Sequence, residues 1–173
     1  MNVLNQVLGI QYDTILDEMD MGRLVDMASH GLLSQEQQTF KESHKVLNEL
    51  FMHPSTSICK KRPETNSIVM RLYNSYVLRI VKNCIEVILT SRMNWQIKGC
   101  GDMLRIINTA ERIGIRAGLK IEKGVLSEIL ESYSEDVNAD ISVLTNLERM
   151  LNASSKEEAE GLAVLINSKL YEA

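Results

Sequence analysis

Apolar residues recur at spacings of three and four along almost the whole chain, and no segment shows the alternating pattern of a strand. The chain has only two prolines, Pro54 and Pro63, and it is rich in Leu, Ile, Met, Glu and Lys, which favour helices. A length of 173 residues is enough to bury one core. We therefore expect an all-α protein, a compact bundle or orthogonal array of seven to eight helices.

The most apolar segment, at about 66–92, is predicted to be a long central helix, because apolar residues cover most of its circumference. Its narrow polar strip includes Arg71, Arg79, Lys82 and Glu86. Charged residues at a bilayer centre cost roughly 2.5–3.5 kcal/mol each, so the segment is a poor membrane span. The N-terminus also lacks a basic region followed by a cleavage site, so we expect no secretory signal and no membrane partner.

A long connection is predicted at 53–67, which holds both prolines and six Ser, Thr or Asn residues. We expect residues 1–173 to form a single all-α domain. Within this domain, the loop would join an N-terminal helical hairpin, 1–52, to a helical body, 68–173.

Local signals predict where several helices begin and end. Gly31 follows an apolar helical segment and is suited to the left-handed conformation that ends many helices. Ser34 with Gln37, and Ser155 with Glu158, have the spacing of a capping box. In this motif the serine accepts a bond from one free N–H and the second side chain returns to another. The two pairs predict helix starts at Ser34 and Ser155.

The Gly99-Cys100-Gly101 segment is predicted to be a turn, with Asp102 as the N-cap of a helix that runs to about Arg116. Two glycines before a helix also resemble half of a phosphate-binding loop. Such a loop needs a third glycine, a lysine and a preceding strand, and the sequence provides none of them here. A plain turn between helices is therefore our interpretation.

Charge is divided into three blocks, although the net charge of the chain is only −4. Residues 1–58 carry 8 acidic and 3 basic side chains, residues 59–124 carry 5 and 13, and residues 125–173 carry 10 and 3. A basic middle thus lies between two acidic ends. Such asymmetry is informative about partners and association rather than about the fold.

Eight cations of the basic block are candidates for contact with a partner or with phosphates. Three interpretations stay open for them: contact with an acidic protein, contact with nucleic acid through segment 105–123, and pairing with acidic helices of the same fold. The helical spacing places Arg105, Arg112 and Arg116 on one side of a helix. The candidates are Lys60, Lys61, Arg62, Arg105, Arg112, Arg116, Lys120 and Lys123.

The acidic segment at about 13–30 combines carboxylates with Met and Leu side chains at helical spacing. One interpretation is a Met-rich groove, rimmed by acid, that binds a partner helix. The other is a helix with core on one side and solvent on the other. The acidic and apolar residues concerned are Asp13, Asp17, Glu18, Asp20, Asp26, Leu16, Met19, Met21, Leu24 and Met27.

The sequence contains no catalytic or metal-binding motif. Cys59, Cys84 and Cys100 form no C-x-x-C and are expected to be reduced thiols of an intracellular protein. His44 shares the apolar face of Phe40 and is expected to be packed and hydrogen-bonded. We therefore expect no metal, no cofactor and no enzymatic activity.

These patterns favour a non-enzymatic helical protein–protein interaction module that uses charged and Met-rich surfaces, such as an adaptor, an inhibitor or an assembly factor. The alternative is a nucleic-acid-binding regulator or replication accessory protein that contacts phosphates through residues 105–123. Complementary charge blocks also favour a homo-oligomer. We expect an intracellular location, which is cytoplasmic, or nuclear in a eukaryotic source.

Overall fold

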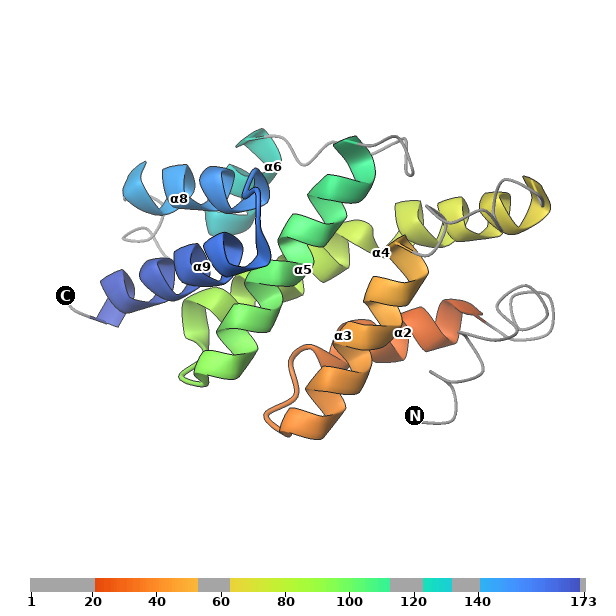
Figure 1. Cartoon of the computed structure of the whole chain (residues 1–173), viewed down its shortest axis with the longest axis horizontal. Coiled ribbons are helices and arrows are strands. Elements are labelled where there is room, and N and C mark those ends of the chain that lie inside the picture. Colours follow the sequence, from red (N-terminus) through yellow and green to blue (C-terminus); the bar gives the residue numbers. More distant parts are fainter. Residues whose placement is uncertain (1–20, 53–62, 113–122, 132–140, 172–173) are drawn as a thin grey trace.

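The computed structural model describes residues 21–52, 63–112, 123–131 and 141–171. These ranges are all-helical and contain seven helices and no strand, which confirms the predicted all-α class (Figure 1). The helices are α2 (Met21–Gly31), α3 (Gln37–Met52), α4 (Pro63–Thr90), α5 (Asn94–Arg112), α6 (Lys123–Glu131), α8 (Ile141–Leu151) and α9 (Lys156–Tyr171). Within these ranges, none of the helices combines the length and the hydropathy that a membrane span needs.

Helix α5 lies in the middle of the fold, where it contacts α3, α4, α8 and α9. Helices α2 and α3 pack against each other at one end of the molecule, and α8 and α9 pack against each other at the other end (Figure 1). Because α5 contacts members of both pairs, its side chains connect the two ends of the described core.

The buried side chains of α4 that the structure describes lie between Val77 and Leu89. Arg71, Asn74 and Ser75, farther toward its N-terminus, are exposed. The helix begins at Pro63, inside the segment that the sequence predicts to be a loop. A proline is well tolerated in the first turn of a helix, since its missing N–H has no helical partner there. Residues 53–62 of that predicted loop lie outside the described residues.

The predicted turn at Gly99–Gly101 is wrong, because α5 runs without a break from Asn94 to Arg112. The two glycines instead permit close helix packing. A Cβ on Gly99 would lie 2.5 Å from Cε1 of Phe40 in α3, and a Cβ on Gly101 would lie 2.7 Å from Cβ of Ala163 in α9. Glycine is required here because neighbouring helices approach where a side chain would stand.

The two predicted serine caps are present in modified form. Ser34 Oγ accepts a hydrogen bond from the N–H of Glu36 at 3.2 Å, just before α3 begins. Ser155 Oγ accepts the N–H of Glu158 at 3.1 Å, as a capping box requires. The Glu158 carboxylate accepts the N–H of Ser154 at 2.8 Å and its hydroxyl at 2.9 Å, one residue earlier than predicted. These bonds lower the pKa of Glu158.

Amide side chains from other helices bond carbonyl groups at three helix C-termini. Gln96 donates to the carbonyl of Leu32, just after α2, at 2.9 Å. Asn108 donates to the carbonyl of Leu151, at the end of α8, at 2.6 Å. Asn167 donates to the carbonyl groups of Ile88 and Ser91, at the end of α4, at 2.8 and 3.0 Å. Terminal carbonyls lack a partner within their own helix, so these bonds fix how the helices meet.

Candidate functional site: a lysine-rimmed aromatic pocket beside a buried carboxylate

Most of the predicted basic contact residues lie outside the described residues. Five of the eight candidates lie outside these ranges. Two others are at helix ends: Arg112 is the last residue of α5, and Lys123 is the first residue of α6. The five are Lys60, Lys61, Arg62, Arg116 and Lys120.

The guanidinium of Arg105, the remaining candidate, is occupied by an interaction within the fold. Its Nε–H and Nη2–H both donate to Oδ1 of Asp102, at 3.1 and 2.7 Å. Arg105 therefore neutralises a carboxylate of its own helix, which reduces the charge that it offers to a phosphate.

Asp102 is a buried carboxylate within α5, not the N-cap that the sequence predicts, and its side chain is 6 % exposed. While Arg105 holds Oδ1, two nitrogens face Oδ2: Nε2 of His44 at 3.8 Å and Nζ of Lys156 at 3.9 Å. These side chains come from α3, α5 and α9. A buried charge is tolerated only when it is paired, so Asp102 accounts for the cations gathered around it.

His44 packs between α3 and α5 and is 18 % exposed at its side chain. Burial lowers the pKa of His44, and this effect outweighs Asp102, which raises it. The imidazole also has a hydrogen bond to the backbone of Gly99, whereas Nε2 is buried and has no hydrogen-bond partner among the described residues. The predicted packing of His44 is thus correct, but its bonding is incomplete. Because its pKa is lowered, the His44 imidazole is neutral at pH 7.

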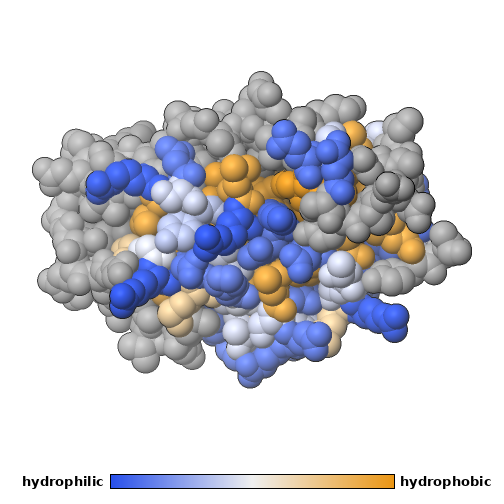
Figure 2. Space-filling model, turned by 180° about the vertical axis from the view of Figure 1, so that it is seen from behind, coloured by the Kyte–Doolittle hydropathy of each residue, from blue (hydrophilic) through white to orange (hydrophobic). Residues whose placement is uncertain are grey.

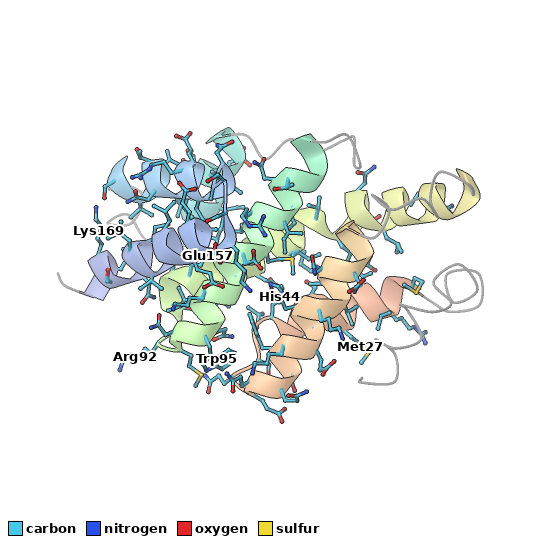
Figure 3. All side chains as sticks on the ribbon, viewed as in Figure 1. Met27, His44, Arg92, Trp95, Glu157 and Lys169 are labelled. Carbon is cyan, nitrogen blue, oxygen red and sulfur yellow. The ribbon has the colours of Figure 1, made fainter. Side chains whose placement is uncertain are left out.

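An open cavity of about 310 Å³ lies next to this cluster, where α3, α5 and α9 meet. Phe40 and Trp95 give it an aromatic wall, with ring centroids 5.2 Å apart in an edge-to-face arrangement. Figure 3 shows Trp95 and His44 along the boundary between α3 and α5. We call this cavity the Phe40–Trp95 pocket. Its aromatic wall offers apolar contact to a ligand side chain.

Three lysines stand at the rim of the Phe40–Trp95 pocket. Lys156 is paired with Glu160 at 3.6 Å as well as facing Asp102. Lys41 and Lys98 are exposed, and neither forms an ion pair with a residue that the structure describes. Two ammonium groups are therefore available to an anionic ligand at the mouth of an apolar cavity.

A second cavity, of about 420 Å³, lies where the α2–α3 and α4–α5 connections meet. It is larger, but its polar groups already bond one another. Ser91 donates to Oε1 of Gln96 at 2.8 Å, and the amide nitrogen of Gln96 donates to the carbonyl groups of Leu32 and Ser34. We therefore place the candidate site at the smaller cavity, where Lys41 and Lys98 have no ion-pair partner among the described residues.

Exposed apolar residues do not form one docking stripe in the described part of the chain. The large exposed ones are Met27, Leu33, Leu78 and Leu165, and they belong to different elements. Figure 2 shows apolar atoms at several places on one face, separated by hydrophilic side chains. Single exposed apolar residues of this kind are common on protein surfaces.

The Met-rich groove predicted at the N-terminus stays a prediction, and three of its apolar residues are described. Met21 and Leu24 are buried in the core, whereas Met27 is 67 % exposed. Asp26 forms an ion pair with Arg79 of α4, so one acidic residue of the first block pairs with a cation of the basic block. The remaining residues of that prediction, at 13–20, lie outside the described residues.

The two described cysteines, Cys84 in α4 and Cys100 in α5, are free and fully buried. Burial, together with a hydrogen bond to Cys84, raises the pKa of Cys100 well above its usual range. Because a thiolate is the reactive form, the Cys100 thiol is a poor nucleophile. In the described ranges, no group of three His, Cys, Asp or Glu side chains is arranged to hold a metal ion. Cys59 lies outside these ranges.

Comparison with protein families, with curated proteins and with solved structures finds no match for this chain. The site therefore has to be interpreted from its own geometry. Sequence patterns do not reveal it, because His44, Asp102 and Lys156 are more than fifty positions apart in the chain. The local feature of the sequence that indicated this site was His44, a histidine on the apolar face of a helix.

Proposed function

We propose that this protein is a non-enzymatic helical interaction module that binds a segment of another protein at the Phe40–Trp95 pocket. The observation that supports this most directly is the pocket's composition: an aromatic wall with Lys41 and Lys98 at the rim, neither paired with a described residue. Aromatic side chains in a cavity are typical of sites that anchor a partner's side chain, and charges at the rim add electrostatic complementarity. An adaptor, an inhibitor or an assembly factor would use such a site.

The proposed scaffold of this module is a compact bundle around α4 and α5. The apolar part of α4, from Val77 to Leu89, packs against α5, and α5 contacts α3 and α9, which form the other walls of the pocket. A pocket between three packed helices keeps its shape without a ligand, which reduces the entropy that binding costs. This arrangement favours recognition by a preformed site.

Binding has more support than catalysis at this site. Nε2 of His44 is buried and lies 3.8 Å from Oδ2 of Asp102, so it is shielded from solvent. General acid–base catalysis needs a proton-transferring atom within hydrogen-bond reach of the substrate. The lysines at the rim contribute charge but no nucleophile that a neighbouring base activates.

The alternative, nucleic-acid binding through residues 105–123, has less support, because Arg105 is engaged with Asp102. It stays a prediction, as do homo-oligomer formation and an intracellular location, whether cytoplasmic or nuclear. An acidic protein segment suits the pocket better, since one carboxylate can be met by lysine charge while a neighbouring apolar side chain contacts the rings.

Selection of binders from a random displayed-peptide library would test the proposed function. Peptides enriched on the wild-type protein should bind the Lys41→Glu/Lys98→Glu variant roughly tenfold more weakly, because each reversal replaces attraction by repulsion. The matched control is Lys82→Glu, an exposed lysine of α4 that does not line the pocket. Enrichment of no peptide, or equal binding to the pocket variant and the wild type, would contradict the proposal.

A further inference from the structure

The two oxygens of the Asp102 carboxylate differ in their contacts: Oδ1 accepts hydrogen bonds, whereas Oδ2 faces two nitrogens at a longer distance. Oδ1 accepts two hydrogen bonds from Arg105, whereas Oδ2 faces His44 Nε2 at 3.8 Å and Lys156 Nζ at 3.9 Å. Both of these distances exceed those of hydrogen bonds. Neither nitrogen is therefore hydrogen-bonded to Oδ2 in this structure.

Protonation of His44 would change this balance. A neutral imidazole whose Nε2 lacks a proton cannot donate to Asp102, whereas the imidazolium donates from both nitrogens. The charged groups around His44 are Asp102 from α5 and Lys156 and Glu160 from α9. Lys41 from α3 and Lys98 from α5 line the same pocket. A charged His44 would bind Oδ2 and displace Lys156 from it.

We infer that the Phe40–Trp95 pocket binds a carboxylate of an acidic protein segment, and that protonation of His44 strengthens this binding by occupying Asp102 and releasing Lys156 to the ligand. This inference rests on the proposed function and adds the chemical class of the partner and its regulation. His44 acts here as a positioning residue, since its Nε2 is buried and does not reach the ligand.

Charge complementarity identifies the occupant. With neutral His44, the charged side chains that line the pocket, Lys41, Lys98, Lys156, Asp102 and Glu160, sum to +1, and protonation of His44 raises this sum to +2. Asp102 repels a ligand carboxylate only weakly, because Arg105 neutralises it. Since protonation adds a positive charge and frees a lysine, affinity for an anion rises as pH falls.

The direction of the pH effect follows from linkage. A ligand that binds better to the protonated form must also raise the pKa of His44 when it binds. Burial places the free protein's transition below the ordinary pKa of 6.5. Affinity should therefore rise between pH 7.5 and 5.0, by about three- to fivefold if one added charge acts through water-like screening. Glutamate side chains, with pKa values of about 4.3, stay mostly ionised in this range.

The test uses the intrinsic fluorescence of Trp95, because it is the single tryptophan of the chain and lines the pocket. The probe is an N-acetylated, C-amidated pentapeptide of four glutamates around one leucine, titrated from pH 7.5 to 5.0. A peptide with glutamines in place of the glutamates, and a single-stranded thymidine oligonucleotide, are the control ligands. We expect saturable binding of the acidic peptide, which tightens three- to fivefold toward pH 5.0.

Two variants separate the histidine effect from other titrations. His44→Gln should bind the acidic peptide with nearly constant affinity over the pH range, because glutamine carries no titrating charge. His30→Gln should behave like the wild type, since His30 is 64 % exposed on α2 and lies outside the pocket. If His44→Gln does not fold, an NMR titration of wild-type His44 gives the same information, because the acidic peptide must raise its pKa.

Each outcome has a distinct meaning. Binding of the oligonucleotide or the glutamine peptide in preference to the acidic peptide would overturn the carboxylate assignment. Acidic-peptide binding whose pH dependence survives in His44→Gln, or an unchanged His44 pKa on binding, would overturn the regulation and leave the interaction function intact. Failure of the proposed function itself is recognised separately, by a displayed library that yields no pocket-dependent peptide.

Discussion

Replacement of Gly101 by alanine tests the close approach of α5 and α9. The added Cβ would lie 2.7 Å from Cβ of Ala163 and 2.9 Å from the carbonyl oxygen of Ala159. Favourable contacts between carbon atoms lie at about 3.5–4.0 Å, so the helices would have to separate by close to an ångström. Neither neighbouring atom is at the end of a flexible side chain, so the strain must be relieved by the backbone.

The expected magnitude is the difference between two effects. Overpacking of a well-packed interface costs about 1–3 kcal/mol, and alanine gains about 1 kcal/mol over glycine in helix propensity. We expect Gly101→Ala to lower the free energy of unfolding by up to about 2 kcal/mol. The matched control is Gly161→Ala in α9, where an added Cβ meets nothing within 4 Å. This variant should be more stable than the wild type by about 0.5–1 kcal/mol.

Urea unfolding followed by circular dichroism measures both variants, with the m-value as a check that the unfolded state is unchanged. A second replacement, Ala163→Gly, removes one of the two clashing atoms and should be less destabilising in the Gly101→Ala background than in the wild type. The reasoning is refuted if Gly101→Ala is as stable as Gly161→Ala, because the glycine would then serve no packing purpose.

Three further predictions concern other parts of the fold. Asn167→Leu should cost about 1–3 kcal/mol in urea unfolding, because the carbonyl groups of Ile88 and Ser91 lose their donor; a neutral result would show that water replaces it. Ser155→Ala should lower thermal stability by about 0.5–2 kcal/mol through loss of the α9 cap, and no change in the melting temperature would contradict this. Burial lowers the folded-state pKa of His44, so the unfolded chain takes up its proton first, and stability should fall as pH drops below 6.5; a pH–stability profile that His44→Gln leaves unchanged would refute this.

The sequence was sufficient for the fold class and for several helix ends, because these depend on local periodicity and local bonds. The end of α2 at Gly31 and the Ser155 cap of α9 are where the sequence predicts them. The start of α5 was predicted wrongly, because a Gly-x-Gly segment has two physical uses. It can form a turn, or it can let two helices approach a third, and only the positions of Phe40 and Ala163 distinguish them.

The candidate site could not be predicted in the same way. Its residues come from three helices, and ion pairs between residues that are distant in the chain produce no periodic pattern in the sequence. In the sequence, Asp102 could be explained as an N-cap, so its role as a buried carboxylate was not predicted. Arg105, the member of the predicted basic segment whose side-chain contacts the structure describes, is engaged with that carboxylate.

The division of the chain into charge blocks describes the pairing in the fold only in part. Asp26 of the acidic first block pairs with Arg79 of the basic block, as complementary blocks would predict. Asp102 reverses the pattern, because it is an acid of the basic block and faces Lys156 of the acidic third block. A partner meets the local charge left after such pairing, not the sum over a block. At the Phe40–Trp95 pocket this remainder is positive, and Lys41, which contributes to it, belongs to a block whose net charge is negative.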